Sequence, residues 1–343
     1  MNLVRWLSLL VVLAQLLGCA PAPASVDCAD VTVFCVGLVT ESGKVSDPGL
    51  NRDSWQAILQ AQEKHLIDKA AFIETVESLD LAKNVDFFLS RKYDLVVTVG
   101  SGLEEISRDA AGNYPDVLFI GIDQSNPEES PNMVGVRFPE DQGGFMAGAL
   151  AALVTQTGVV GAACESDYID SMWRYCEGFR AGATYANAMV SVIVQYRPSG
   201  SGESAFRDEK WGAEAGDNLT KAGADVVFGA GGDTAESALE ATAKVKMMVI
   251  GGGADILVPL PELAPQTISC VVRQVSEALP GLLEQAADGT FSAPNVNAPF
   301  AFTPFNKKIP GLTRAVKNQL LEITRGLADG TILTNVSPEK PGE

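Results

Sequence analysis

Short, almost wholly apolar segments alternate along this chain with longer segments whose apolar residues recur at helical spacing. Residues 31–39 read VTVFCVGLV, and the amphipathic segment 53–65 follows them. A segment that is apolar on both faces is typical of a strand inside a parallel sheet, whose strands are joined by helical crossovers. We predict strands at 31–39, 94–99, 117–122, 159–163, 190–195, 225–229 and 247–251. We predict helices at 53–65, 79–90, 103–111, 142–153, 171–188, 204–222 and 234–243.

The two halves of the chain also resemble each other. Residues 93–100 (YDLVVTVG) and 223–229 (GADVVFG) each place an Asp before a buried strand that leads into a glycine turn. So many strand–helix units fit one compact sheet poorly, so we predict an α/β fold of two doubly wound parallel-sheet lobes joined by a hinge. Ligands bind at the carboxyl ends of the strands in such sheets, so we expect a ligand cleft between the lobes.

The amino terminus is typical of an export signal. Arg5 precedes an apolar segment, residues 6–17, which is shorter than the about 20 residues that a membrane span needs. Leu16-Leu17-Gly18-Cys19 resembles the bacterial lipobox, which implies cleavage before Cys19 and attachment of a diacylglyceryl group to its thiol. We therefore expect a signal peptide at 1–18, a lipidated tether at 19–28 and a mature protein anchored to the extracytoplasmic face of the cell membrane. An ordinary secretory cleavage site with an accidental cysteine is the alternative.

Charge and residue types exclude several other classes of protein. The formal net charge is −18, and such a surface repels phosphate backbones, so we expect no nucleic-acid partner. His65 is the one histidine, which argues against Ser-His-Asp catalysis and against most His-based metal sites. No CxxC pair occurs. We therefore expect no catalytic residues, no metal and no cofactor.

Five cysteines follow Cys19, an odd number that cannot be fully paired within an exported chain. Cys164 and Cys176 flank one short segment and are candidates for a disulfide, as are Cys28 and Cys35. Cys35 and Cys270 also lie in apolar segments, where a cysteine is more often simply buried.

Several motifs, in order and spacing, resemble the basic membrane protein family of lipoproteins. Residues 39–51 (VTESGKVSDPGLN) resemble the family pattern V-T-D-x-G-x-x-x-D-x-S-F-N, and residues 114–123 (YPDVLFIGID) resemble Y-P-D-V-x-F-x-x-x-D. Residues 143–153 and 178–183 are similar to the family's G-S-F-L-A-G-x-L-A and G-F-x-A-G-A. The resemblance implies a type I periplasmic-binding-protein fold that binds a purine nucleoside or a similar molecule.

The same resemblance implies an altered pocket. Leu50 stands where the family has a Phe that stacks on the ligand's base, and Gly253 where an Asp holds the ribose hydroxyls. Arg273 stands where the family has a ligand-facing Lys. Its planar guanidinium donates several hydrogen bonds and suits a different acceptor geometry. Trp173 lies where the family has a ligand-contacting aromatic; a packed helix-start residue is the alternative. The expected ligand-binding residues are Glu41, Asp47, Leu50, Asn51, Gly100, Glu105, Asp123, Trp173, Gly231, Asp233, Gly253, Asp255 and Arg273.

The family's organisation places the first lobe at 29–138 plus 249–290 and the second at 139–248 plus 291–335, with a frayed tail at 336–343. The expected function is delivery of a small molecule to the permease of an ABC importer through hinge closure. The alternative is a lipoprotein that senses a sugar, flavin or amide and signals to a membrane receptor. An enzyme on this fold would need the nucleophile–base pair that the sequence lacks, and a sugar-repressor-type regulator would need a DNA-binding headpiece in place of the lipobox.

Overall fold

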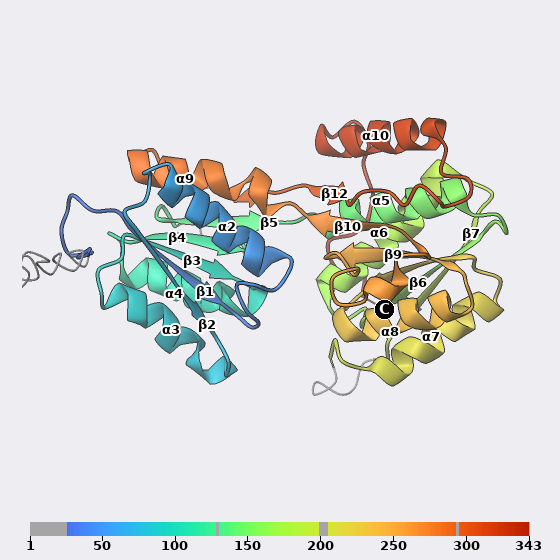
Figure 1. Cartoon of the computed structure of the whole chain (residues 1–343), viewed down its shortest axis with the longest axis horizontal. Coiled ribbons are helices and arrows are strands. Elements are labelled where there is room, and N and C mark those ends of the chain that lie inside the picture. The colour runs from blue at the N-terminus through green and yellow to red at the C-terminus, as the bar shows by residue number, and fades with distance from the viewer. Residues whose placement is uncertain (1–25, 128–129, 199–204, 293–294, 343) are drawn as a thin grey trace, which may run out of the picture.

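Two lobes, each a mainly parallel sheet between helices, make up the structure, a computed structural model (Figure 1). It describes residues 26–127, 130–198, 205–292 and 295–342, so the predicted signal peptide and Cys19 lie outside the described residues. Strand β1 (Cys35–Thr40) and strand β3 (Leu95–Val99) are buried at every position, as strands covered on both faces require. The predicted α/β class with two doubly wound lobes is confirmed.

The first sheet has the strand order β11-β5-β4-β3-β1-β2. Its other strands are β2 (Lys69–Glu74), β4 (Leu118–Ile122), β5 (Met133–Arg137) and β11 (Val296–Asn297). Helices α2 (Leu50–Glu63) and α9 (Leu279–Asp288) lie together on one side of it, with α3 (Leu81–Leu89) and α4 (Glu104–Asn113) on the other (Figure 1). All five strands that precede α9 pair in parallel, so their carboxyl ends share one edge of the sheet.

The second sheet has the order β12-β10-β9-β8-β6-β7. Its strands are β6 (Val159–Cys164), β7 (Ser191–Tyr196), β8 (Val226–Ala230), β9 (Met248–Gly253), β10 (Thr267–Arg273) and β12 (Phe300–Phe302). Its helices are α5 (Glu140–Val154), α6 (Asp170–Ala186), α7 (Glu209–Lys221), α8 (Gly232–Lys244) and α10 (Arg314–Ala328). Only β12 runs antiparallel among the described strands of this sheet.

Within the described residues the chain passes between the lobes three times, at 137–140, 273–279 and 297–300, which we call the hinge segments. They are hydrogen-bonded to one another. The Gln274 amide donates to the Pro299 carbonyl at 2.9 Å, and the Ala298 amide donates to the Arg137 carbonyl at 2.8 Å. The two lobes are therefore joined by a narrow, internally bonded hinge.

The predicted division into lobes is wrong after residue 248. β9 pairs with β8, and β10 pairs with β9, so both belong to the second lobe rather than the first. The chain returns to the first lobe only with α9 and β11. The reason is topological. Helix α8 follows β8 and leads into β9, which pairs with β8 in the same sheet. The connection 254–266 then places β10 beside β9.

The carboxyl-terminal residues also differ from the prediction. Helix α10, which was not predicted, packs on α5. The tail expected to fray instead lies against the second lobe, where Arg174 donates to the Pro338 carbonyl at 2.9 Å and Lys340 pairs with Asp167 at 2.8 Å. Two charged side chains, Arg174 of α6 and Asp167 of the loop before it, hold this segment.

Helices α5 and α6 approach each other closely because glycines line their contact. A Cβ added at Gly144 would lie 1.9 Å from the Tyr175 carbonyl oxygen, and one at Gly148 the same distance from that of Phe179. From the other side, a Cβ at Gly182 would lie 2.0 Å from the Phe145 carbonyl oxygen. Only glycine fits at these positions, so the two helix backbones touch.

Two disulfides join neighbouring elements of the same lobe. Cys28–Cys35 ties the start of the described chain to β1, and Cys164–Cys176 ties the end of β6 to α6. Cys270 is buried and free. The second disulfide matters for the site because α6 carries several cavity residues.

Candidate ligand-binding cleft

A cavity of about 520 Å³ lies between the lobes. Strand ends of the second lobe and the start of α6 form most of its wall, and Pro48, Ser101 and Asp123 contribute from the first lobe. A Cβ added at Gly49 would lie 3.9 Å from the Ala254 Cβ, so the first loop of one lobe meets the β9–β10 loop of the other. The volume falls in the range of small-molecule sites, which is about 300–1,000 Å³.

An ion pair crosses from one lobe to the other at this cavity. The Arg273 Nη1 atom, at the end of β10, lies 2.8 Å from the Asp123 Oδ2 atom, just after β4. Burial works against the charged form of Arg273, but the carboxylates of Asp123 and Glu140 outweigh it, so the pKa of the guanidinium is raised and it stays charged. Its Nε atom is buried and has no hydrogen-bond partner.

Helix α6 presents one face to the cavity. Ser171, Met172 and Tyr175 all line it, and their i, i+3 and i, i+4 spacing places them together on a helix surface. Tyr175 is only 4% exposed, and its Oη atom has no hydrogen-bond partner. Burial raises the pKa of the Tyr175 phenol well above its ordinary value, so the hydroxyl remains a proton donor.

Trp173 faces away from this cavity. Its ring lies 6.1 Å from the Tyr196 ring, nearly parallel to it, and it borders a separate hollow with Glu177 and Arg180. Helix α6 begins at Asp170, one residue before the predicted helix at 171–188, so Trp173 is helical and lies about 100° around the axis from Met172. The structure therefore does not support a ligand-stacking role for Trp173.

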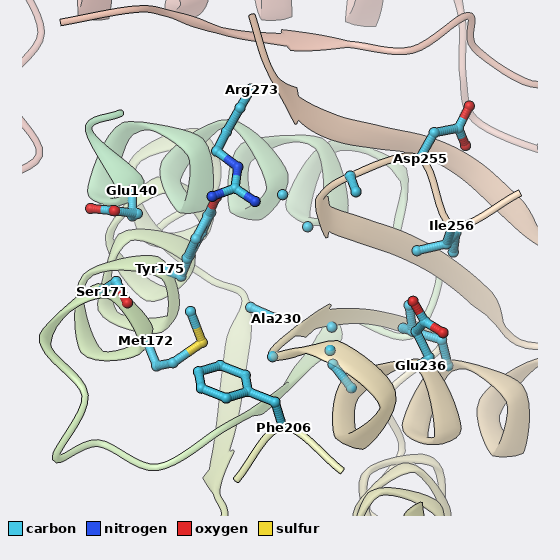
Figure 2. A pocket seen from close by; sticks show the side chains of 18 of the residues that line it. Glu140, Ser171, Met172, Tyr175, Phe206, Ala230, Glu236, Asp255, Ile256 and Arg273 are labelled. Carbon is cyan, nitrogen blue, oxygen red and sulfur yellow. The ribbon is translucent and has the colours of Figure 1, made fainter. Parts of the chain in front are cut away.

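Phe206 supplies an aromatic surface that the sequence interpretation missed. It is 37% exposed and lines the cavity with Met172, on the side away from Arg273 in the view of Figure 2. Its amide donates to the Glu165 Oε2 atom at 3.1 Å, and Glu165 is fully buried and paired with Arg197. A buried ion pair thus holds the backbone at Phe206 itself.

Glu140 is a second missed residue, at the amino-terminal end of α5. Its Oε2 atom accepts from the Arg174 Nε atom at 2.8 Å. Burial raises the pKa of this carboxyl, while Arg174 partly opposes that shift and Asp123 adds to it. Its position after Pro139, in the first turn of a helix, is the sequence signal that would have pointed to it.

Of the predicted ligand-binding residues, five line the cavity: Asp123, Gly231, Gly253, Asp255 and Arg273. Asp255 is partly engaged already, because its Oδ1 atom accepts from the Leu257 amide at 3.0 Å. Asp233 is exposed at the start of α8, and Glu236, one turn later, lines the cavity instead.

Four more of the predicted residues, Glu41, Asp47, Asn51 and Gly100, hold the first lobe's loops in shape and do not line this cavity. The Glu41 carboxylate accepts from the Gly102 amide at 2.9 Å, and Gly100, with φ 117°, leaves room for that side chain. Asp47 accepts from the Lys44 amide at 2.6 Å, and Asn51 donates to the Ser42 carbonyl at 2.8 Å.

Leu50 packs against the hydrophobic core at the start of α2, and Glu105 is exposed on α4.

No cluster of His, Cys, Asp and Glu in the described part of the chain is arranged to hold a metal ion. No helix there combines the length and apolarity needed to cross a membrane.

Comparisons with known proteins give the chain's relatives. Residues 34–295 match the family described as ABC transporter substrate-binding protein PnrA-like. The chain is 25% identical over 207 residues to the CD4+ T-cell-stimulating antigen of Listeria monocytogenes serovar 1/2a, covering 59% of this chain and 55% of that protein. It is 25% identical over 221 residues to the ABC transporter nucleoside-binding protein BmpA of Lactococcus lactis subsp. cremoris, covering 63% of this chain and 60% of that one. The chain thus spans less than two thirds of the length of these relatives.

A solved structure shows the same fold. The ABC transporter system solute-binding protein from Conexibacter woesei DSM 14684 superposes with a TM-score of 0.72 at 19% identity, over 88% of this chain and 98% of that chain. The family match takes in both lobes, α9 and the hinge segments up to the start of β11. The chain therefore belongs to the PnrA-like family of ABC transporter substrate-binding proteins.

Proposed function

We propose that this protein is an extracytoplasmic, lipid-anchored binding protein that delivers a purine nucleoside, or a similar molecule with a ring and a polyol, to an ABC importer. The observation that carries the proposal is the inter-lobe cavity, where Arg273 of the second lobe is bonded to Asp123 of the first. The name of the Lactococcus relative, a nucleoside-binding protein, supports this ligand class.

Hinge closure is the proposed mechanism. The three hinge segments are short and bonded mainly to one another, so the lobes can rotate about them without breaking either sheet. A ligand that touches Ser101 in the first lobe and Tyr175 in the second gains contacts as the lobes approach. Its higher affinity for the closed form shifts the population toward that form, which the importer then binds.

Phe206 is the proposed surface for the ligand's ring. It offers an aromatic face whose backbone is held by Glu165, next to the apolar Met172, whereas Leu50 is partly buried and packs against the core. Aromatic pairs contribute about 0.5–1.5 kcal/mol beyond the area that they bury. Stacking on Phe206 would therefore orient the ring. Polar groups at the end of the cavity next to Arg273, which we call the hinge end, would fix the edge of the ring.

Replacing Phe206 with leucine is expected to weaken nucleoside binding by about tenfold, because it removes the aromatic face while keeping an apolar side chain. The measurement is a thermal-shift panel of nucleosides, bases, flavins, sugars and small amides, followed by calorimetry on the nucleosides that bind. Phe87→Leu is a matched control, since Phe87 is similarly exposed, at 39%, on α3 outside the cavity. If only sugars, flavins or amides stabilise the protein, the nucleoside proposal is wrong.

The lipid anchor rests on Leu16-Leu17-Gly18-Cys19 and has its own test. Cys19→Ala is expected to abolish incorporation of labelled palmitate and to release the protein from the membrane fraction, because the thiol carries the diacylglyceryl group that holds the fatty acids. Phe87→Leu again serves as the control and should remain in the membrane fraction. Persistence of both labelling and membrane association in the Cys19 variant would contradict the anchor.

A further inference from the structure

The hinge end of the cavity contains hydrogen-bond donors without acceptors. The Tyr175 Oη atom and the Arg273 Nε atom are both buried, and neither has a hydrogen-bond partner. Figure 2 shows the Arg273 guanidinium extending toward Tyr175. A buried polar group left unpaired costs about 1–3 kcal/mol, a cost that a ligand with a suitable acceptor would remove.

Gly253 leaves a space beside these donors. With φ 85°, it lines the cavity at the end of β9, and a Cβ placed there would lie 3.5 Å from the Tyr175 Oη atom and 3.9 Å from the Arg273 Nη2 atom. No backbone atom lies within 4 Å of that position, apart from the glycine and its chain neighbours. An oxygen atom slightly closer to the two side chains than this position would be within hydrogen-bond distance of the Tyr175 Oη atom and the Arg273 Nη2 atom. The unpartnered Nε atom of Arg273 does not lie within 4 Å of this position, so Nη2 is the Arg273 donor of this space.

The charge around this space argues against an anionic ligand. Among the described residues that line the cavity, Asp123, Glu140, Glu236 and Asp255 carry carboxyl groups, and Arg273 is the one guanidinium. The Arg273 charge is already paired with Asp123 at 2.8 Å. A carboxylate or phosphate would enter a region with an excess of negative groups, whereas a neutral carbonyl accepts hydrogen bonds without adding charge.

We propose that Tyr175 and Arg273 form a donor subsite beside Gly253, and that this subsite takes a neutral carbonyl oxygen of the ligand's ring. The inference rests on the proposed function and narrows it. Oxo-nucleosides are preferred over their amino counterparts, because an amino group would place a donor against two donors. A site built to pair a polar group discriminates strongly against an analogue that leaves its buried groups unpaired.

The test uses nucleoside pairs that share the same sugar. Inosine and adenosine differ by an oxo or an amino group at position 6, and uridine and cytidine differ in the same way at position 4. Calorimetry on the purified protein is expected to show at least about a tenfold tighter Kd for the oxo member of one pair or both. In the Tyr175→Phe variant, the affinity for the oxo member is expected to fall until the Kd values of the two members lie within about threefold of each other.

Tyr196→Phe is the matched control, because its hydroxyl donates to the Glu177 Oε1 atom at 2.9 Å outside the cavity. This variant should keep the oxo preference. Tyr175→Phe removes a hydroxyl without a partner, so its melting temperature should stay close to that of the unaltered protein.

The outcomes separate this inference from the proposed function. Equal affinities within both pairs, or an oxo preference that survives in Tyr175→Phe, overturn the donor subsite while nucleoside binding stands. If none of the four nucleosides binds, the proposed nucleoside function falls, and the inference that rests on it falls as well.

Discussion

Replacing Gly148 with alanine is expected to lower the free energy of unfolding by about 3 kcal/mol or more. The added Cβ would lie 1.9 Å from the Phe179 carbonyl oxygen and 2.8 Å from the Ala183 amide nitrogen. Both are backbone atoms of α6, which cannot rotate aside as a flexible side chain can. Helices α5 and α6 must therefore separate, and the apolar packing between them loosens along their length. Urea denaturation followed by circular dichroism measures the loss.

Gly281→Ala is the matched control for this prediction. Gly281 lies in the first turn of α9, and a Cβ there meets no atom within 4 Å. Alanine loses less conformational entropy than glycine on folding, so this variant should be neutral or more stable, by up to about 1 kcal/mol. Equal stability of the Gly148 and Gly281 variants would show that the two helices can adjust their spacing at little cost.

The close contact of α5 and α6 also matters for the site. Tyr175, whose carbonyl lies against Gly144, presents its ring to the cavity from the same turn of α6. The Cys164–Cys176 disulfide fixes the next residue of that turn to β6. A rigid α6 therefore positions the phenol that we assign to the donor subsite.

Arg273→Met is expected to weaken inosine binding by about 100-fold or more. The substitution removes the donors at the hinge end of the cavity and leaves the Asp123 carboxylate without its partner at 2.8 Å. A hydrogen bond to a charged group contributes about 1.5–3 kcal/mol, and loss of the inter-lobe pair also disfavours the closed form, which together correspond to this loss of affinity. Calorimetry with inosine measures the Kd, and circular dichroism checks that both lobes remain folded.

Arg180→Met is the matched control, because Arg180 also forms an ion pair, with Glu177 at 2.9 Å, but lies outside the cavity. It should bind inosine as the unaltered protein does. Arg273→Lys keeps the charge but loses the planar fork, so its affinity should lie between those of the methionine variant and the unaltered protein. An Arg273→Met variant that binds within about threefold of the unaltered protein would show that the guanidinium does not contact the ligand.

Local patterns in the sequence predicted seven of the described strands, because a buried strand and its amphipathic helix are specified by nearby residues, whereas β10, which carries Arg273, was not predicted. β1, β3, β4, β6, β7, β8 and β9 lie within a few residues of their predicted positions. β2 was missed because it is a partly exposed edge strand, and β5 because MVGVR is short and interrupted by glycine. Asp123, Gly253 and Arg273 were assigned to the pocket from sequence motifs, and all three line the cavity.

Tertiary structure alone decided which residues meet across long sequence distances. Nothing near residue 248 specifies whether β9 pairs with the first sheet or the second, because pairing depends on the partner strand and not on the strand's own pattern. The phase of α6, set by its start at Asp170, turned Tyr175 toward the cavity and Trp173 away from it. The pair between Arg273 and Asp123 joins residues 150 positions apart. The sequence thus determined the lobes and a set of pocket residues, whereas the packing of the folded chain decided which donors in that pocket remain free for a ligand.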